Sequence, residues 1–515
     1  MARITKEKRR TVAEIMSAPV VTASSSETIA QAAEQMRENS VGSVVVVGGE
    51  RPIGILTERD LVRFAASGAE ASVTKISEWM TGEPETVEPS TDVAFAFQKL
   101  ADRGFRHIPV VDGGRLEGIV SMRDLMKIAQ IQPAGSIAAD IPRGLKGVVV
   151  AETAVGDVRG EEGFFHYRQY DATELARKRT LEDVWFLLLE GNLPNEAEGE
   201  NFAQEVRSLR EIPLTVREIL PSLNDLRPDA SLLDLLQAAY SVTVAAFDYG
   251  ASLDSDRSSL RAAVLRTCAV MPTLTVALHR LRQGLEPLDP HPGLGHAANF
   301  LYMLTGEDPP PDQVRALEQY LILTADHGFN ASTFTARVIT STGASLGSAV
   351  AGALGALSGP LHGGAPSRAL DMLDAIGTPE NADSWIRAAI ERGDRLMGFG
   401  HAIYRTTDPR SIMLQEVAER LGGARLEFAK HVESRAVALL NKLKPGRRLY
   451  TNVEFYAAIV LDAAGLPREM FTPTFACSRV IGWTSHILEQ ALDNRIIRPS
   501  AHYVGPAPPE PVPAS

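Results

Sequence analysis

Cysteine is scarce in this chain, which has only two, Cys268 and Cys477, among 515 residues. Two cysteines cannot build a disulfide framework, so we expect reduced thiols and a cytoplasmic location. The chain also lacks an excess of positive charge, because its formal net charge is −12 at pH 7. Binding to the phosphates of a nucleic acid needs a basic surface, so the composition argues against a nucleic-acid partner.

Long apolar runs of the kind that cross membranes are lacking as well. The basic residues 1–10 are followed by no apolar stretch, so they are not expected to be a secretory signal. Residues 338–357 are mostly small and apolar, but Ser and Thr interrupt them and large apolar side chains are few. A spanning helix would carry more Leu, Ile and Phe. We therefore expect a buried helix whose small residues let neighbouring backbones approach closely, and no membrane partner.

Two kinds of catalytic signature are also absent. The chain contains no P-loop and no CxxC or HExxH pattern. These patterns mark phosphate-binding loops and metal sites, so the sequence predicts neither a P-loop nucleotide site nor a bound metal.

A tandem repeat occupies the N-terminal part of the chain. Three pairs of identical residues recur at one constant spacing: Met16 and Met80, Gly54 and Gly118, and Asp60 and Asp124. Within each copy, apolar residues at i, i+3, i+4 and i+7 predict an amphipathic helix, at residues 26–36 and 91–100. Each helix is followed by two short β-rich runs and a closing helix. A unit this small cannot bury both faces of its sheet, so the two copies are expected to pack together.

The runs GILTERD (54–60) and GIVSMRD (118–124) resemble the signature of the cystathionine-β-synthase (CBS) domain pair, or Bateman module. The resemblance covers about residues 11–130, with copies at about 11–68 and 75–130. It implies an α/β fold with a cleft between the copies that binds an adenine nucleotide such as AMP or ATP. The implied nucleotide-binding residues are Thr57, Asp60, Ser121 and Asp124.

The residues themselves leave a second interpretation of this motif open. A carboxylate can accept two hydrogen bonds from a ribose diol, and a hydroxyl can donate to a phosphate oxygen. Each aspartate could equally cap the helix that follows it, in a purely structural pair. Nothing in the sequence identifies which nucleotide would bind.

The character of the chain changes after the repeat. Residues 131–142 carry Pro and Gly and are predicted to be a linker. Short strands and turns are expected from residue 143. From about residue 180 to 500, apolar residues recur at intervals of three and four, and Gly or Pro follows many of these segments. This part of the chain is predicted to be a large, mainly α-helical domain.

Side chains suited to acid–base catalysis and to carboxylate binding gather in short motifs of this domain. They are His327 and Asn330 at a helix end, His362 in a Gly-rich turn that opens a helix, His401, Arg405 and Arg410 in GFGHAIYRTTDPR, Glu454 at a helix start, and Arg479 and Arg498 near the end. Arginines beside histidines suit a substrate with more than one carboxylate, because a guanidinium group binds a carboxylate with two hydrogen bonds. A carboxylate beside neutral histidines suits abstraction of a proton next to a carbonyl. The helix start at His362 is expected to keep its imidazole neutral.

These motifs resemble the citrate synthase family: GPLHGGA, GFGHAIYRTTDPR, NVEFY and RIIRPSAHYVGP follow one another in the family's order. The resemblance covers about residues 143–506. It implies a mainly α fold with a large and a small helical domain, the small one at about residues 385–475. It also implies condensation of acetyl-CoA with oxaloacetate to citrate and CoA, without a cofactor or a metal, in a homodimer or a higher homo-oligomer.

The resemblance also implies a role for each residue that matches the family's motifs. His362 would polarise the thioester carbonyl, Glu454 would take the α-proton, and His401 would donate to the ketone oxygen of oxaloacetate. The dicarboxylate would be bound by His327, Arg410, Arg479 and Arg498, the last from the other subunit. The phosphates of CoA would meet Arg405, Lys444 and Arg447, with Lys442 and Arg448 as weaker candidates.

Position 454 departs from the family, whose usual base at this position is aspartate. The ordinary pKa values of the two side chains, about 3.9 and 4.3, differ little. The extra methylene group, however, moves the carboxylate by on the order of an ångström, and such a shift can cost around a hundredfold in rate. The backbone could be set back to compensate, the enzyme could be slow, or the site could serve another acyl-CoA. We favour compensation, because every other catalytic position is intact.

Two alternatives to a citrate synthase stay open. The first is a 2-methylcitrate synthase that uses propionyl-CoA, because one extra methyl group in a pocket is worth only about 1–3 kcal/mol. The second is a catalytically weak homologue that senses nucleotides. The fusion of the two parts predicts a synthase regulated by adenine nucleotides, and the Pro-rich residues 507–515 are predicted to be disordered.

Overall fold

The computed structural model of the chain contains two compact units. Unit 1 takes in residues 1–148 and the end of the chain from residue 502, and unit 2 takes in residues 149–501. The structure describes residues 11–39, 41–93, 95–96, 99–100, 105–121, 143–145, 147–227, 229–359, 362, 365–400, 404, 406–444, 449–501 and 503–505. Several predicted features lie outside the described residues: residues 1–10, Asp124, the linker 131–142, His401, Arg405, Arg447, Arg448 and the tail 507–515.

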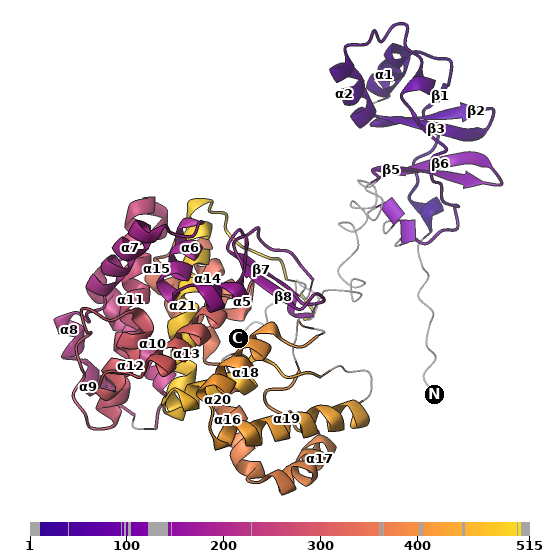
Figure 1. Cartoon of the computed structure of the whole chain (residues 1–515). Coiled ribbons are helices and arrows are strands. Elements are labelled where there is room, and N and C mark those ends of the chain that lie inside the picture. Colours follow the sequence, from indigo (N-terminus) through magenta and orange to yellow (C-terminus); the bar gives the residue numbers. More distant parts are fainter. Residues whose placement is uncertain are drawn as a thin grey trace, which may run out of the picture. The chain divides into compact units, whose positions relative to one another are not determined.

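Unit 1 is an α/β structure built from two similar β-hairpins (Figure 1). Its described elements are η1 (Val12–Glu14), β1 (Thr22–Ser24), α1 (Ile29–Glu38), β2 (Ser43–Gly48), β3 (Arg51–Thr57), α2 (Glu58–Ser67), η2 (Ile76–Glu78), β4 (Thr81–Gly82), β5 (His107–Asp112) and β6 (Arg115–Ser121). Strands β1 to β4 form one sheet in that order, and β5 pairs with β6. Helix α1 overlaps the predicted stretch 26–36 and continues to Glu38, and Thr28 caps its start by accepting from the Gln31 amide.

The two hairpins share one irregularity, which supports the predicted repeat. Both are antiparallel, and the register shifts between Val46 and Val47 in the first and between Val110 and Val111 in the second. Glycine with positive φ lies in each turn, as tight hairpin turns require. The two halves therefore match in backbone detail as well as in sequence.

Each half of unit 1 is completed by a segment that precedes the other half in sequence. Val12 of η1 is buried in the core of the second hairpin, and Ile76 of η2 is buried in the core of the first. A Cβ atom on Gly118 would lie 2.5 Å from Met16 Sδ. A Cβ atom on Gly54 would lie 2.3 Å from Met80 Sδ. The repeated methionines and glycines are thus contact partners across this exchange.

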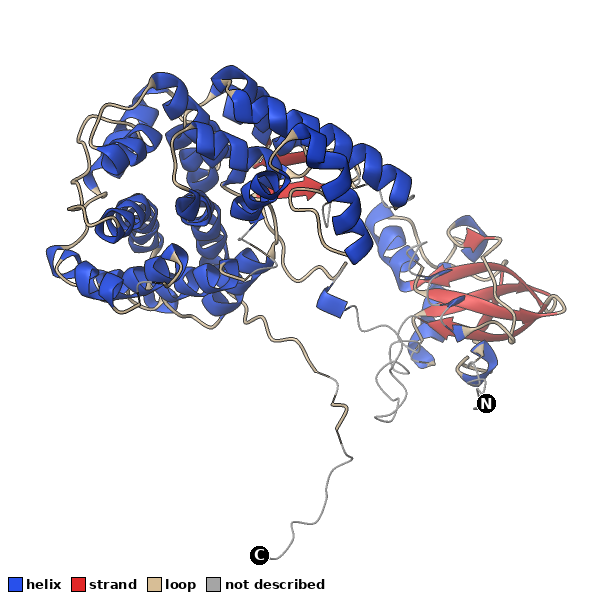
Figure 2. Cartoon of the chain, turned by 90° about the horizontal axis from the view of Figure 1, so that it is seen from below, coloured by secondary structure: helices blue, strands red, loops and turns tan. Residues whose placement is uncertain are grey.

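Unit 2 is helical apart from one small sheet, as Figure 2 shows. Strands β7 (Gly156–Arg159), β8 (Phe164–Tyr167) and β9 (Tyr170–Asp171) form that sheet. The helices are α5 (Ala172–Lys178), α6 (Leu181–Glu190), α7 (Glu196–Ser208), α8 (Leu214–Arg217), α9 (Leu220–Asp225), α10 (Leu232–Phe247), α11 (Arg257–Arg282), α12 (His296–Thr305), α13 (Pro311–Thr324), α14 (Ala331–Ser341), α15 (Leu346–Leu357), α16 (Ala365–Ile376), α17 (Ala382–Arg392), α18 (Pro409–Leu421), α19 (Ala424–Leu443), α20 (Val453–Ala463) and α21 (Phe471–Leu492). Short 3-10 turns η3 (Arg143–Leu145), η4 (Ser252–Asp254), η5 (Pro379–Asn381) and η6 (Arg468–Met470) lie between them. The predicted change from strands to helices is confirmed.

Helix α21 forms the centre of unit 2 and packs against α11, α13, α14, α15 and α16 (Figure 1). Helices α16 to α20, drawn in orange, pack mainly on one another, and α13 contacts both α18 and α20. Among the described residues, α11 is the one helix long and apolar enough to cross a membrane, but 83% of its most apolar stretch is buried inside the unit. It has the surroundings of a core helix.

Residues 338–357, predicted as one buried helix, form parts of two helices instead. Helix α14 ends at Ser341, the chain turns at Gly343 with φ of 82°, and α15 begins at Leu346. The predicted close approach is present, because a Cβ atom on Gly347 would lie 2.3 Å from a methyl group of Val244. The run GASLG (343–347) matches the G-x-S-x-G pattern of serine hydrolases, in which the serine lies on a turn from a strand to a helix. Here Ser345 lies between two helices and caps α15, so the match has no such role.

The exchange in unit 1 makes a reciprocal prediction. Val12→Ala should cost about 2 kcal/mol, because it leaves a cavity in the core of the second hairpin. Hydrogen exchange should then become faster in β5 and β6 and stay unchanged in β2 and β3. The matched variant Ile76→Ala should give the opposite pattern. If hydrogen exchange became faster only in the hairpin that follows each mutated segment in sequence, η1 and η2 would not complete the opposite halves of unit 1.

Candidate active site

His327 lies in the loop between α13 and α14, enclosed by aromatic side chains. The loop turns at Gly328, whose φ is 61°, and Asn330 then caps α14 by accepting from the Thr333 amide at 3.1 Å. His327 Nε2 lies 3.1 Å from the Tyr404 hydroxyl, and its ring centroid is 5.8 Å from that of Phe165. Only 7% of His327 is exposed. The predicted helix end therefore presents this imidazole inside the unit.

Arg410 enters the same region from α18. Its Nε and Nη2 donate to Asp408 at 3.0 and 2.8 Å, in a pair that is almost completely buried. The guanidinium carbon lies 5.9 Å from the ring of Phe165 and 6.0 Å from that of Tyr404, the two rings that flank His327. Arg410 and His327 thus share one aromatic enclosure.

Asp408 also connects this enclosure to α20. Its Oδ2 atom, besides accepting from Arg410, accepts from the Val453 amide at 3.2 Å, the first amide of α20. The next residue is Glu454. One buried carboxylate therefore fixes both the arginine and the start of the helix that carries the predicted base.

The start of α20 is joined to the loop that leads to His401. Asn452 caps α20 by accepting from the Glu454 amide at 3.0 Å. Its amide and its side chain donate to the carbonyls of Gly398 and Gly400, each at 2.9 Å. His401 itself lies outside the described residues. The residue before it is held against the helix start that positions Glu454.

Glu454 is half-buried and has an unusual titration. Burial raises the pKa of its carboxyl group to about 7, while Arg410 opposes the rise and Asp408 adds to it. A carboxylate with such a pKa is a far stronger base than one in water, yet part of the population is ionised near neutral pH. This environment suits proton abstraction from a weak carbon acid.

Arg479, on α21, is buried and donates from one of its three guanidinium nitrogens to a described residue. Its Nε donates to the Thr324 carbonyl at 2.8 Å, and its guanidinium carbon lies 4.6 Å from the Phe475 ring. Among the described residues, none accepts a hydrogen bond from its two terminal nitrogens. Burial lowers the pKa of Arg479 to about 10, so it stays a cation at neutral pH. A buried cation with free donors is suited to an anionic ligand.

His362 is oriented by Ser332. His362 Nε2 lies 2.8 Å from the Ser332 hydroxyl, which also accepts from Trp483 Nε1 at 3.0 Å. Burial, and next the charge of Arg479, lower the pKa of His362 to about 4. The predicted neutral imidazole is therefore present, but these two effects are its cause rather than the helix start.

Known proteins resemble both units. The family model for the citrate synthase C-terminal domain matches residues 144–500, and the CBS domain model matches residues 12–67 and 76–130. The chain belongs to the citrate synthase family. It carries a CBS domain pair at its N-terminus and is an acyltransferase of the citrate synthase type.

The relatives include enzymes with two different names. The chain is 38% identical to a citrate synthase from Synechocystis, over 70% of this chain and 90% of the relative. It is 40% identical to a 2-methylcitrate synthase from Mycobacterium tuberculosis, over 71% of this chain and 91% of the relative. Sequence identity therefore does not distinguish between the two enzyme names, because both relatives are nearly equally similar to this chain.

Solved structures agree with this assignment. The citrate synthase of Thermotoga maritima is 34% identical with a TM-score of 0.64, covering 73% of this chain and 98% of that one. The citrate synthase of Thermoplasma acidophilum, solved as a ternary complex with carboxymethyl coenzyme A and oxaloacetate, is 30% identical with a TM-score of 0.68 and the same coverage.

Three predicted residues of the citrate synthase unit stand apart from the enclosure. Arg498 is exposed and makes no hydrogen bond or ion pair with a described residue. Lys444 is half-exposed at the end of α19, and Lys442 is exposed. Within one copy of the described chain, they are not joined to the other candidate residues.

In the CBS pair, Thr57 and Asp60 are bonded to each other. Asp60 Oδ2 accepts from the Thr57 amide at 3.0 Å and from its hydroxyl at 2.7 Å, in a capping box at the start of α2. Its Oδ1 lies 3.4 Å from Arg63. Ser121 ends β6, and Asp124 lies outside the described residues. Asp60 is thus the third residue of α2 and bonds to Thr57 at the N-cap position, whereas the capping interpretation expected the aspartate itself to precede and cap the helix.

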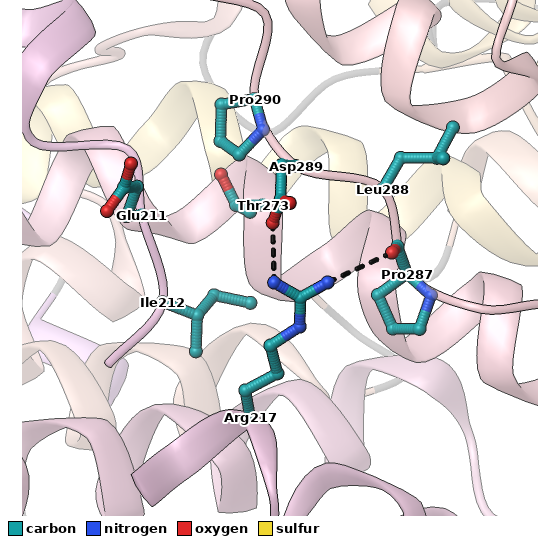
Figure 3. A pocket seen from close by; sticks show the side chains of 8 residues that line it. All are labelled: Glu211, Ile212, Arg217, Thr273, Pro287, Leu288, Asp289 and Pro290. Atoms are coloured by element: carbon teal, nitrogen blue, oxygen red, sulfur yellow. Dashed lines mark hydrogen bonds and ion pairs between the residues drawn. The ribbon is translucent and has the colours of Figure 1, made fainter. Parts of the chain in front are cut away.

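A cavity of about 60 Å³ lies elsewhere in the citrate synthase unit (Figure 3). The Arg217 guanidinium, bonded to Asp289 and to the Pro287 carbonyl, lies across it. Its other lining residues are Glu211, Ile212, Thr273, Leu288 and Pro290. A volume of this size holds about two water molecules. None of the candidate site residues lines it, so it is not the substrate site.

The site depends on two residues that sequence reasoning missed. Asp408 stands before a proline at a helix start, where an aspartate usually serves as a cap, and it does cap α18. Ser332 is one of several hydroxyl side chains in α14. The DPR run, which places an acid two residues before a predicted substrate arginine, was a signal for Asp408. No sequence signal distinguished Ser332.

Proposed function

We propose that the citrate synthase unit condenses acetyl-CoA with oxaloacetate to give citrate and CoA. The observation that carries the proposal is the meeting of two buried arginines, Arg410 and Arg479, with His327, beside a neutral His362 and a strongly basic Glu454. The cations suit a dicarboxylate, and the neutral imidazole and the carboxylate suit formation of an enolate. We further propose that the protein works in the cytoplasm, where Cys268 and Cys477 stay reduced.

The first step would be removal of a proton from the acetyl methyl group. Glu454 would take the proton, and the electron pair would move to the thioester oxygen. His362 would stabilise that oxygen by donating from Nδ1. This role requires the Ser332 hydroxyl to donate to Nε2, which fixes the tautomer. Ser332 has one proton, and Asn330 Oδ1 at 2.8 Å competes for it.

The enolate carbon would then bond to the ketone carbon of oxaloacetate, while His401 donates a proton to the ketone oxygen. The two carboxylates would be bound by His327, Arg410 and Arg479. Water would hydrolyse the resulting thioester and release CoA. Arg405, Lys444 and Arg447 would meet the CoA phosphates.

We propose a homodimer as the active unit. Arg498 is the one predicted oxaloacetate ligand that is exposed rather than buried. An exposed arginine on the segment after α21 is available to a second copy of the chain, as the family resemblance implies. The dicarboxylate would then meet a third guanidinium group from the partner.

Propionyl-CoA is the second candidate substrate. The observation in its favour is that relatives named citrate synthase and 2-methylcitrate synthase are nearly equally similar to this chain, at 38% and 40% identity. An acyl pocket distinguishes the two by about 1–3 kcal/mol at most. Both reactions would use the same residues.

Release of free thiol from acyl-CoA in the presence of oxaloacetate tests the proposal. We expect kcat/KM for acetyl-CoA to exceed that for propionyl-CoA by about 10-fold or more, within the range that one methyl group allows. The reverse order would make the enzyme a 2-methylcitrate synthase. Absence of thiol release from both, with oxaloacetate still bound, would identify a catalytically weak homologue.

The CBS pair is proposed to regulate this activity through an adenine nucleotide. Coupling requires two sites and a different nucleotide affinity in two states of the enzyme. Binding near Asp60 would exchange its bonds to Thr57 for bonds to a ribose.

We expect AMP or ATP to change the KM of one substrate by about 5-fold or more, and Asp60→Asn to abolish that response. Turnover without nucleotide should be unchanged. Glu50→Gln, which removes an exposed ion-pair partner of Arg115 in the same unit, is the control. A response that survives Asp60→Asn, or no response to either nucleotide in the wild type, would contradict regulation at this site.

A further inference from the structure

One face of α21 is fastened to the end of α13 and to the loop that follows it. Three hydrogen bonds make this connection: Ser478 Oγ to the Leu321 carbonyl (2.6 Å), Arg479 Nε to the Thr324 carbonyl (2.8 Å) and the Gly482 amide to the Ala325 carbonyl (3.1 Å). The loop carries His327, and the helix carries Arg479. The relative position of these two candidate ligands is therefore set along this seam.

Gly482 permits the close approach of loop and helix. A Cβ atom at this position would lie 2.3 Å from the Ala325 carbonyl oxygen and 2.9 Å from Asp326 Oδ1. Only glycine leaves room for backbone contact at such a distance. Asp326 is consequently held directly against α21.

Asp326 is adjacent to His327 in sequence, and its side chain contacts α21. It is 1% exposed, its Oδ2 accepts from the Gly328 amide at 3.0 Å, and its Oδ1 lies 3.3 Å from His486 Nε2. Burial opposes ionisation of this carboxyl group, but His486 and then Arg479 outweigh it, so its pKa lies below the ordinary value. A carboxylate buried this deeply needs a partner, and His486 supplies one.

His486 has a defined tautomer, because Arg337 faces its other nitrogen. Arg337 Nη1 lies 3.3 Å from His486 Nδ1, and a guanidinium group can only donate. Nδ1 therefore accepts, and the ring proton is on Nε2, toward Asp326. The Nε2–Oδ1 contact is not aligned as a hydrogen bond, so it acts as a contact between a charge and an N–H dipole. The Thr153 hydroxyl, 3.5 Å from Nδ1, is the other polar neighbour.

Arg337 anchors this chain of contacts in the rest of unit 2. Its Nη1 donates to Glu489 at 2.6 Å, and its Nε donates to Gln490 at 3.0 Å. Its guanidinium carbon lies 5.4 Å from the ring of Phe329, which belongs to the same loop as His327. The loop is therefore connected to α21 twice: Asp326 contacts His486 directly, and Phe329 contacts Arg337, which bonds to Glu489 and Gln490.

We infer that Asp326 and His486 are positioning residues for the dicarboxylate site, which hold His327 on the loop and Arg479 on α21 at the separation that one substrate requires. Neither residue is expected to touch the substrate. The inference rests on the proposed condensation with oxaloacetate. A displacement of on the order of 1 Å at such a site can cost around a hundredfold in rate.

The test uses His486→Leu and Asp326→Asn in the full-length chain. We expect the KM and the Kd for oxaloacetate to rise by about 10- to 100-fold and the KM for acetyl-CoA to change by less than about threefold. His486→Gln should restore oxaloacetate binding to within about fivefold of the wild type, because its amide can accept from Arg337 and donate to Asp326. Calorimetry measures the Kd without turnover.

His296→Leu is the matched control. His296 is another buried histidine of unit 2, its ring meets that of Trp185 edge to face, and neither of its ring nitrogens has a partner in the described part of the chain. Its replacement should leave both KM values unchanged, whatever it does to thermal stability. This control separates a positioning role from a general loss of packing.

Unchanged oxaloacetate affinity in Asp326→Asn and His486→Leu would overturn the inference and leave the proposed function intact. An equal rise in both KM values would also overturn it, because a general structural role predicts that pattern. If His486→Leu does not fold, Asp326→Asn and His486→Gln decide the question. A wild-type protein that does not bind oxaloacetate would refute the proposed function and this inference together.

Discussion

Burial of two guanidinium groups, those of Arg410 and Arg479, is the constraint on which the catalytic unit depends. Arg410 is neutralised by Asp408, while Arg479 keeps two terminal nitrogens without an acceptor among the described residues. A buried charge is costly unless it is paired. The carboxylate of Asp326 favours the charged form of Arg479, and a bound dicarboxylate can accept from the terminal nitrogens. Burial and then the charge of Arg479 lower the pKa of His362, and Arg410 limits the rise in pKa that burial causes at Glu454.

Glutamate at position 454 is consistent with this electrostatic setting. Sequence comparison with the family raised only the question of reach, because the side chain is one methylene longer than aspartate. The structure adds a second consideration, since burial brings the pKa of Glu454 to about 7. Asp408 and Asn452 accept hydrogen bonds from the first two amides of α20, those of Val453 and Glu454. These bonds fix the backbone from which the Glu454 side chain extends. Position and basicity are set by the same buried contacts.

Much of the fold could be predicted from local patterns, and the exceptions have physical causes. Periodicity predicted α1 and the helical unit, but not the break at Gly343, because small residues fit both a helix and a close turn. The exchange of Val12 and Ile76 between hairpins depends on contacts distant in sequence. Motifs predicted His362 and Arg479, whereas Asp408 and His486 act through partners brought together only by folding. His362 was rightly predicted to be neutral, for a different reason.

The pH dependence of kcat/KM for acetyl-CoA, in the wild type and in Glu454→Asp, tests the central claim most directly. A base must be ionised to accept a proton, and burial raises the pKa of Glu454 to about 7. The wild-type value should therefore fall about tenfold per unit below about pH 7, and the midpoint should move in Glu454→Asp. His362, with a pKa of about 4, should add no further loss above about pH 5. A flat profile between about pH 5.5 and 8, or a midpoint unchanged by the substitution, would contradict Glu454 as the base.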